Sequence, residues 1–115
     1  MKTISWNEIL ALSEAGHPVL CIDVREAYRH RSFDAGGNQI PFNQISRYAA
    51  QLMPHKAVLT VVCCLRPTGS KRTVKAASEL HKLGFTDVRE LKNGLYTGWI
   101  QKVGSTVKLP KLIET

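Results

Sequence analysis

The pattern of apolar and polar positions is clearest at residues 58–64, where seven consecutive residues are apolar or β-branched. A run of this kind is typical of a strand that is buried on both faces. Pro67 and Gly69 interrupt the pattern, because neither residue suits the interior of a strand or a helix. Ser70 then predicts the N-cap of a helix. The apolar positions that this helix is expected to turn toward a core are Val74, Ala77, Leu80 and Leu83.

The rest of the chain alternates between strand-like and helix-like segments. Apolar runs predict further strands at 19–24 and 88–91, with short extended segments at 4–6 and 40–41. Apolar residues at helical spacing predict helices at 7–14, 45–53 and 95–103, and the charged segment 26–31 is interpreted as a short helical turn. Ser5 is the expected N-cap of the first helix. This alternation predicts an α/β domain with a central, mostly parallel sheet flanked by helices, and with 58–64 as its middle strand.

The length of 115 residues fits a single domain, with a core at about 4–103 and an extended tail at 104–115. No internal repeat, heptad pattern or low-complexity tract is present in the sequence. No apolar run approaches the roughly 18 residues that a membrane span needs, and the N-terminus has no signal-like apolar run. We therefore expect a cytoplasmic protein that does not associate with a membrane.

Cysteine content and charge narrow the classes of function. Three cysteines do not make a disulfide framework, and no Cys/His spacing is typical of a zinc site, so we expect reduced thiols and no metal site. The net charge is +7, but the basic residues are scattered and form no stripe with interleaved aromatics. Nucleic-acid binding is therefore not expected. A small anionic substrate or an acidic protein partner fits the sign of the charge.

Candidate chemistry gathers where the predicted central strand ends. Cys64 ends this strand, immediately before a basic loop and a helix start, which is where open α/β sheets bind ligands. The free N–H groups of the helix, together with nearby cations, form a cup that binds an anion or stabilises a thiolate. The residues expected to line this cup are Arg66, Thr68, Gly69, Ser70, Lys71 and Arg72. Side chains alternate along a strand, so Cys63 should face the opposite way, into the core. Cys21 lies in the middle of a predicted strand and is also expected in the core.

Six segments, in this order, carry a resemblance to a known family. They are I-D-V-R-E at 22–26, G-G-N-Q-I-P at 36–41, V-V-C-C at 61–64, K-R-T-V-K-A-A at 71–77, L-G-F-T-D-V at 83–88 and L-K-N-G-L-Y-T-G-W at 91–99. Together they resemble the rhodanese family in its single-domain form. The resemblance implies a rhodanese-like fold and a thiosulfate sulfurtransferase activity, which needs no metal or organic cofactor. It also implies that the Cys64 thiolate takes sulfane sulfur from thiosulfate or a persulfide, and that the resulting persulfide passes the sulfur to a thiol, cyanide or an acceptor protein. Asp23 and Arg25 are interpreted as structural supports of the neighbouring loops.

The chain departs from the family pattern at the proposed site. Family members place the catalytic cysteine at the head of a six-residue loop, and counting back from the helix start puts that position on Pro67. Counting forward along the strand puts it on Cys64, with about three extra loop residues; we choose Cys64 because loops absorb insertions whereas a buried strand's register is fixed. In addition, Ser32-Phe33 stands where many members carry Gly-His.

Two alternatives remain open at the level of sequence. A catalytically silent module that binds a partner through the basic loop is favoured if Pro67 occupies the catalytic position. A cysteine-dependent phosphatase or arsenate reductase on a similar scaffold is the other. The phosphatases place five residues between cysteine and arginine, whereas seven separate Cys64 from Arg72, so the spacing disfavours this reading.

Overall fold

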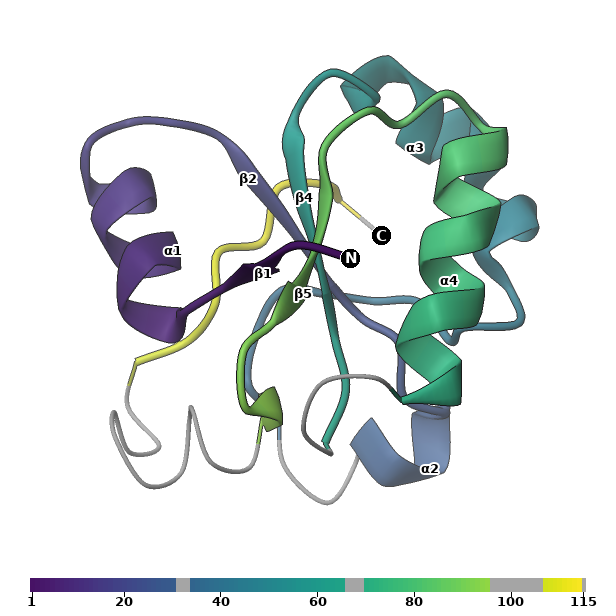
Figure 1. Ribbon diagram of the computed structural model, residues 1–115, viewed down its shortest axis with the longest axis horizontal. Coiled ribbons are helices and arrows are strands. Elements are labelled where there is room, and N and C mark those ends of the chain that lie inside the picture. The colour runs from purple at the N-terminus through teal and green to yellow at the C-terminus, as the bar shows by residue number, and fades with distance from the viewer. Residues whose placement is uncertain (31–33, 66–69, 96–106, 115) are drawn as a thin grey trace.

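The structure is a computed structural model that describes residues 1–30, 34–65, 70–95 and 107–114. One five-stranded sheet has the strand order β1-β5-β4-β2-β3 (Figure 1). The strands are β1 (Thr3–Ile4), β2 (Val19–Asp23), β3 (Asn38–Gln39), β4 (Leu59–Cys63) and β5 (Val88–Leu91). Every neighbouring pair is parallel, so the predicted parallel sheet is confirmed, with β4 in its middle.

Helices cover both faces of the sheet (Figure 1). α1 (Trp6–Glu14) covers one face; α3 (Ala49–Leu52) and α4 (Lys71–Lys82) cover the other. α2 (Ala27–His30) is a single turn that follows β2, and 3-10 turns at Ile45–Tyr48 and Met53–His55 flank α3. Among the described helices, none is long and apolar enough to cross a bilayer.

Alternation along the central strands divides the core into two layers. Ile22 and Val62 pack with the buried residues of α4, whereas Cys21 and Val61 pack with those of α1. Because both faces of β2 and β4 are covered, nearly every residue of these strands is buried. This two-sided burial is why the strands are continuous apolar runs in the sequence.

Two predicted helix starts are confirmed. The Ser5 hydroxyl accepts from the Glu8 amide at 3.1 Å while the Glu8 carboxylate accepts from the Ser5 amide, which makes a capping box for α1. Ser70 caps α4, and its hydroxyl accepts from the Thr73 amide at 3.1 Å.

Three details differ from the sequence prediction or lie beyond it. Val74 was expected to face the core but is 53% exposed. Thr73 and Ala76 are buried in its place, because α4 turns its Thr73 face toward the buried carboxylate of Glu90 on β5.

The continuous helix predicted at 45–53 is instead two 3-10 turns around one turn of α-helix. The second 3-10 turn includes Pro54, which has no N–H to continue a helix. The helix predicted at 95–103 lies outside the described residues except for Leu95.

The C-terminal tail, residues 107–114, extends along the outer edge of β3. Leu109 forms a parallel bridge with Gly36, and its amide donates to the Ala35 carbonyl at 2.8 Å. The Asn38 side chain donates to the Ile113 carbonyl at 2.6 Å and accepts from the Ile113 amide at 3.2 Å. Gly36 is required at this crossing, because its φ is +90° and an added Cβ would lie 2.6 Å from the Leu109 carbonyl oxygen.

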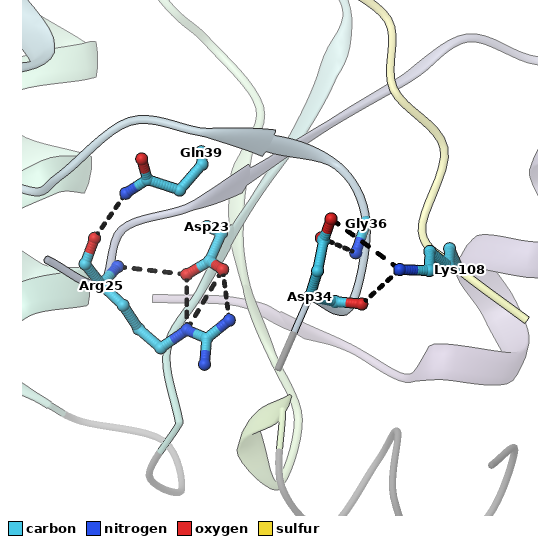
Figure 2. Close-up of polar contacts among 6 residues, drawn as sticks. All are labelled: Asp23, Arg25, Asp34, Gly36, Gln39 and Lys108. Atoms are coloured by element: carbon cyan, nitrogen blue, oxygen red, sulfur yellow. Dashed lines mark hydrogen bonds and ion pairs between the residues drawn. The ribbon is translucent and has the colours of Figure 1, made fainter. Parts of the chain in front are cut away.

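A polar contact fixes the start of the tail to the loop before β3 (Figure 2). The Lys108 ammonium donates to the Asp34 carbonyl oxygen at 2.9 Å, and the Asp34 carboxylate accepts from the Gly36 amide at 2.8 Å. The tail therefore covers a sheet edge whose backbone groups would otherwise be open to another strand.

Candidate functional site

Cys64 is the first residue beyond the central strand, at the edge of the sheet where the parallel strands end. Its backbone carbonyl accepts from the Leu95 amide at 2.8 Å, and the carbonyl of Cys63 accepts from the Val24 amide at 2.9 Å. The backbone around Cys64 is therefore held by the segments that follow both β2 and β5. Its side chain belongs to the core layer on the α4 side and is 5% exposed.

The other two thiols lie in the opposite layer, which the alternation of side chains predicted for Cys63, and Cys21 is in the core as expected. Burial raises the pKa of Cys21 to about 12. Burial also raises the pKa of Cys63 well above its ordinary value, and the neighbouring Cys21 and Asp23 charges raise it further. Both groups are fully buried and remain protonated thiols at neutral pH. Cys64 is thus the one thiol of the three with any exposed surface.

The first turn of α4 forms one wall of the site. Ser70 and Lys71 stand at its N-terminus, where the first N–H groups have no partner within the helix. Thr73, in the same turn, donates from its hydroxyl to the carboxylate of Glu90, which is buried on β5. This contact attaches the start of the helix to the sheet beside the central strand.

Glu90 is a residue that the sequence analysis missed. The segment V-R-E-L predicted a strand, but a carboxylate within it was not singled out. The sequence signal that could have found it is the alternation of side chains along a strand, which places Glu90 on the same face of β5 as the buried Val88. An acid on the inner face of a strand needs a donor, and here Thr73 supplies one.

Arg72 extends from the same turn toward the loop that follows β2. Its guanidinium contacts the Glu26 carboxylate in three ways: Nε to Oε1 at 2.9 Å, Nε to Oε2 at 3.0 Å, and Nη2 to Oε1 at 2.8 Å. The guanidinium carbon also lies 5.7 Å from the centre of the Phe42 ring, as does the ammonium of Lys75. The hydrogen bonds to Glu26 raise the pKa of Arg72. Arg72 is therefore a cation in the first turn of the helix that packs on the same core layer as Cys64.

A buried ion pair supports the loop after β2 (Figure 2). Arg25 donates to the Asp23 carboxylate from Nη2 at 2.6 Å and from Nε at 2.9 Å, and both side chains are completely buried. The Asp23 carboxylate also accepts from the Arg25 amide at 3.1 Å, and the Arg25 carbonyl accepts from the Gln39 side chain at 2.7 Å. The pair therefore fixes the path of the chain between β2 and Glu26.

The structure brings together most of the predicted site residues that it describes. Ser70, Lys71 and Arg72 lie at the start of α4, and Asp23 is paired with Cys63, the neighbour of Cys64, in the strand register. The predicted residues Arg66, Thr68 and Gly69, and also Pro67, lie outside the described residues. Within the described ranges, no group of three or more His, Cys, Asp or Glu side chains is arranged to hold a metal ion. The described chemistry is that of a cysteine at the end of the central strand and a cation in the first turn of the helix that packs on the same core layer.

Comparisons with known proteins agree on the fold. No protein-family model matches the chain, and no curated protein matches it. Among solved structures, thiosulfate sulfurtransferase from Pseudomonas aeruginosa has a TM-score of 0.73 at 23% identity, over 90% of this chain and 19% of that one. The chain thus spans about a fifth of the length of the Pseudomonas protein.

Two further solved structures match the chain over nearly their whole length. A rhodanese-like domain protein from Staphylococcus aureus has a TM-score of 0.71 at 21% identity, over 94% of this chain and 99% of that one. The Saccharomyces cerevisiae single-domain sulfurtransferase RDL2 has a TM-score of 0.67 at 19% identity, over 93% of this chain and 94% of that one. Both share with this chain the arrangement of its sheet and helices.

Proposed function

Because the chain has a rhodanese-like fold, we propose that it is a sulfurtransferase that carries sulfane sulfur on Cys64. The position of this residue supports the proposal most directly. Cys64 follows the central strand, the carbonyls of Cys63 and Cys64 both accept backbone hydrogen bonds, and Arg72 lies in the first turn of α4, the helix that packs on the same core layer as Cys64. Solved proteins of the same fold include a thiosulfate sulfurtransferase and a single-domain sulfurtransferase.

The reaction consists of two displacements at sulfur. In the first, the Cys64 thiolate attacks the outer sulfur of the donor; a bond from Cys64 to that sulfur forms and the donor's sulfur–sulfur bond breaks. With thiosulfate the leaving group is sulfite, and Cys64 becomes a persulfide anion. In the second, a nucleophile such as cyanide or a thiol attacks the outer sulfur and the Cys64 thiolate leaves. Each displacement conserves electrons, so no oxidant or reductant is required.

Two groups in the described site act on the charges in this reaction. A thiolate and a thiosulfate dianion together carry three negative charges, which repel one another as they approach. The start of α4 presents free N–H groups and the positive end of a helix dipole. Arg72 supplies a cation on the same turn. We expect the predicted loop residues, Arg66, Thr68 and Gly69, to complete the cup.

The proposal is tested by following sulfur transfer in purified protein. With thiosulfate as donor and cyanide as acceptor, the wild type should form thiocyanate and Cys64→Ala should not. Cys21→Ala is the matched control: it removes a thiol of the opposite layer and should keep the activity as long as the protein is folded. Thiocyanate formation by folded Cys64→Ala at the wild-type rate would refute the role of Cys64.

A further inference from the structure

Glu26 is ion-paired with Arg72, the cation that the proposed reaction needs. Its carboxylate makes two hydrogen bonds to Nε of Arg72 and an ion-pair contact of 2.8 Å to Nη2. The side chains of Glu26 and Arg72 are 23% and 30% exposed, so about a quarter of the pair is in contact with water and it is screened less than a fully exposed pair. In the resting site, most of the charge of Arg72 is thus balanced before any donor arrives.

The pair also joins the two sides of the site. Glu26 follows β2, whose end is hydrogen-bonded to the end of β4 through the Val24 amide and the Cys63 carbonyl. Arg72 belongs to the first turn of α4, 46 residues further along the chain. A negative charge therefore lies at the end of the sheet where Cys64 follows β4, at a position set by Arg72, which itself stacks on the Phe42 ring.

This arrangement distinguishes between two kinds of sulfur donor. Thiosulfate brings two negative charges to the thiolate, and Glu26 repels both. An alkyl persulfide brings one charge, and its leaving group is a thiolate with a single charge. In that reaction the Cys64 thiolate attacks the outer sulfur, the alkyl thiolate leaves, and Cys64 retains the persulfide, so charge and electrons balance. The Glu26 carboxylate therefore weakens the binding of a donor further with each negative charge that the donor carries.

We propose that Glu26 is a specificity-determining residue that disfavours inorganic dianions and selects an alkyl or protein persulfide as the sulfur donor. The inference rests on the proposed sulfurtransferase function, since it names the donor for the same site. It adds to that function a residue whose removal should increase the use of thiosulfate. A residue with a merely structural role would not have this effect.

The test compares Glu26→Gln with the wild type on two donors. Glutamine keeps the size and an oxygen acceptor for Arg72 but removes the charge. We expect KM for thiosulfate to fall about tenfold and KM for the persulfide of 2-mercaptoethanol to fall only about threefold, because one carboxylate acts on two charges in the first case and on one in the second. Glu79→Gln is the matched control: it removes the partner of Lys82 on α4, in the ion pair at 3.4 Å, and should change neither KM.

Sulfate binding provides a second readout that does not depend on sulfur transfer. Sulfate is an unreactive dianion, and when bound at the site it should protect Cys64 from alkylation by iodoacetamide. The sulfate concentration for half protection should fall about tenfold in Glu26→Gln and rise about tenfold in Arg72→Gln. If no donor loads Cys64 in any variant, the sulfurtransferase proposal fails, while the sulfate series still tests Glu26. Equal or weaker sulfate protection in folded Glu26→Gln, or an equal change of KM for both donors, would overturn the inference.

Discussion

The contact between Thr73 and Glu90 should be a main determinant of the stability of the site wall. Thr73→Val keeps the shape of the side chain but removes the hydroxyl that donates to a buried carboxylate. A hydrogen bond to a charged group contributes about 1.5–3 kcal/mol, and loss of the donor leaves the carboxylate less well solvated. At about 2.1 cal/mol/K per residue, the unfolding entropy of a chain this long is about 0.24 kcal/mol/K, so the melting temperature should fall by about 6–12 °C.

Thermal unfolding followed by circular dichroism measures this change. Thr86→Val is the matched control, because Thr86 is an exposed residue before β5 and its substitution should move the melting temperature by less than about 2 °C. Glu90→Gln should cost less than Thr73→Val, since the amide oxygen still accepts from the Thr73 hydroxyl. If Thr73→Val melted within about 2 °C of the wild type, the contact would not hold α4 to the sheet.

Three other outcomes follow from the described structure. Competitive alkylation at neutral pH, read by peptide mapping, should label Cys64 before either of the other thiols, since burial raises their pKa values; equal labelling would contradict this. Burial of protonated Cys21 stabilises the fold below about pH 9, and this stabilisation should be lost as the pH rises toward its folded pKa of about 12, so Cys21→Ala should flatten the alkaline decline seen in urea melts. Asp23→Ala should cost about 3–5 kcal/mol in urea unfolding because it removes the carboxylate that pairs with the buried Arg25 charge; a cost below about 1 kcal/mol would show that the ion pair is not structural.

The sheet and α4 were predictable because their signals are local. The apolar run at 58–64 contains β4, and the segment 88–91 matches β5 at both ends. Two-sided burial requires an apolar residue at nearly every position, so such strands are recognisable without knowledge of their neighbours. The cap at Ser70 was predictable for the same reason, since the hydroxyl bonds an amide three residues away.

The contacts that define the site were not predictable, because they join residues that are far apart in the chain. Glu26 and Arg72 are 46 residues apart, and no pattern in either segment indicates the other. Asn38 contacts the tail 75 residues further on, and only its neighbouring glycines marked a turn. Val74 was assigned to the core because it is apolar and correctly spaced, but a buried Thr73–Glu90 contact rotates that face of the helix outward.

The most direct test of the account is to locate sulfur on the protein itself. Wild-type protein is incubated with thiosulfate or with the persulfide of 2-mercaptoethanol, and intact mass spectrometry followed by peptide mapping identifies the modified residue. The account predicts one added sulfur atom, on Cys64, which cyanide removes as thiocyanate. If folded protein takes up no sulfur on Cys64 from either donor, the enzyme interpretation is wrong and a catalytically silent binding module should replace it.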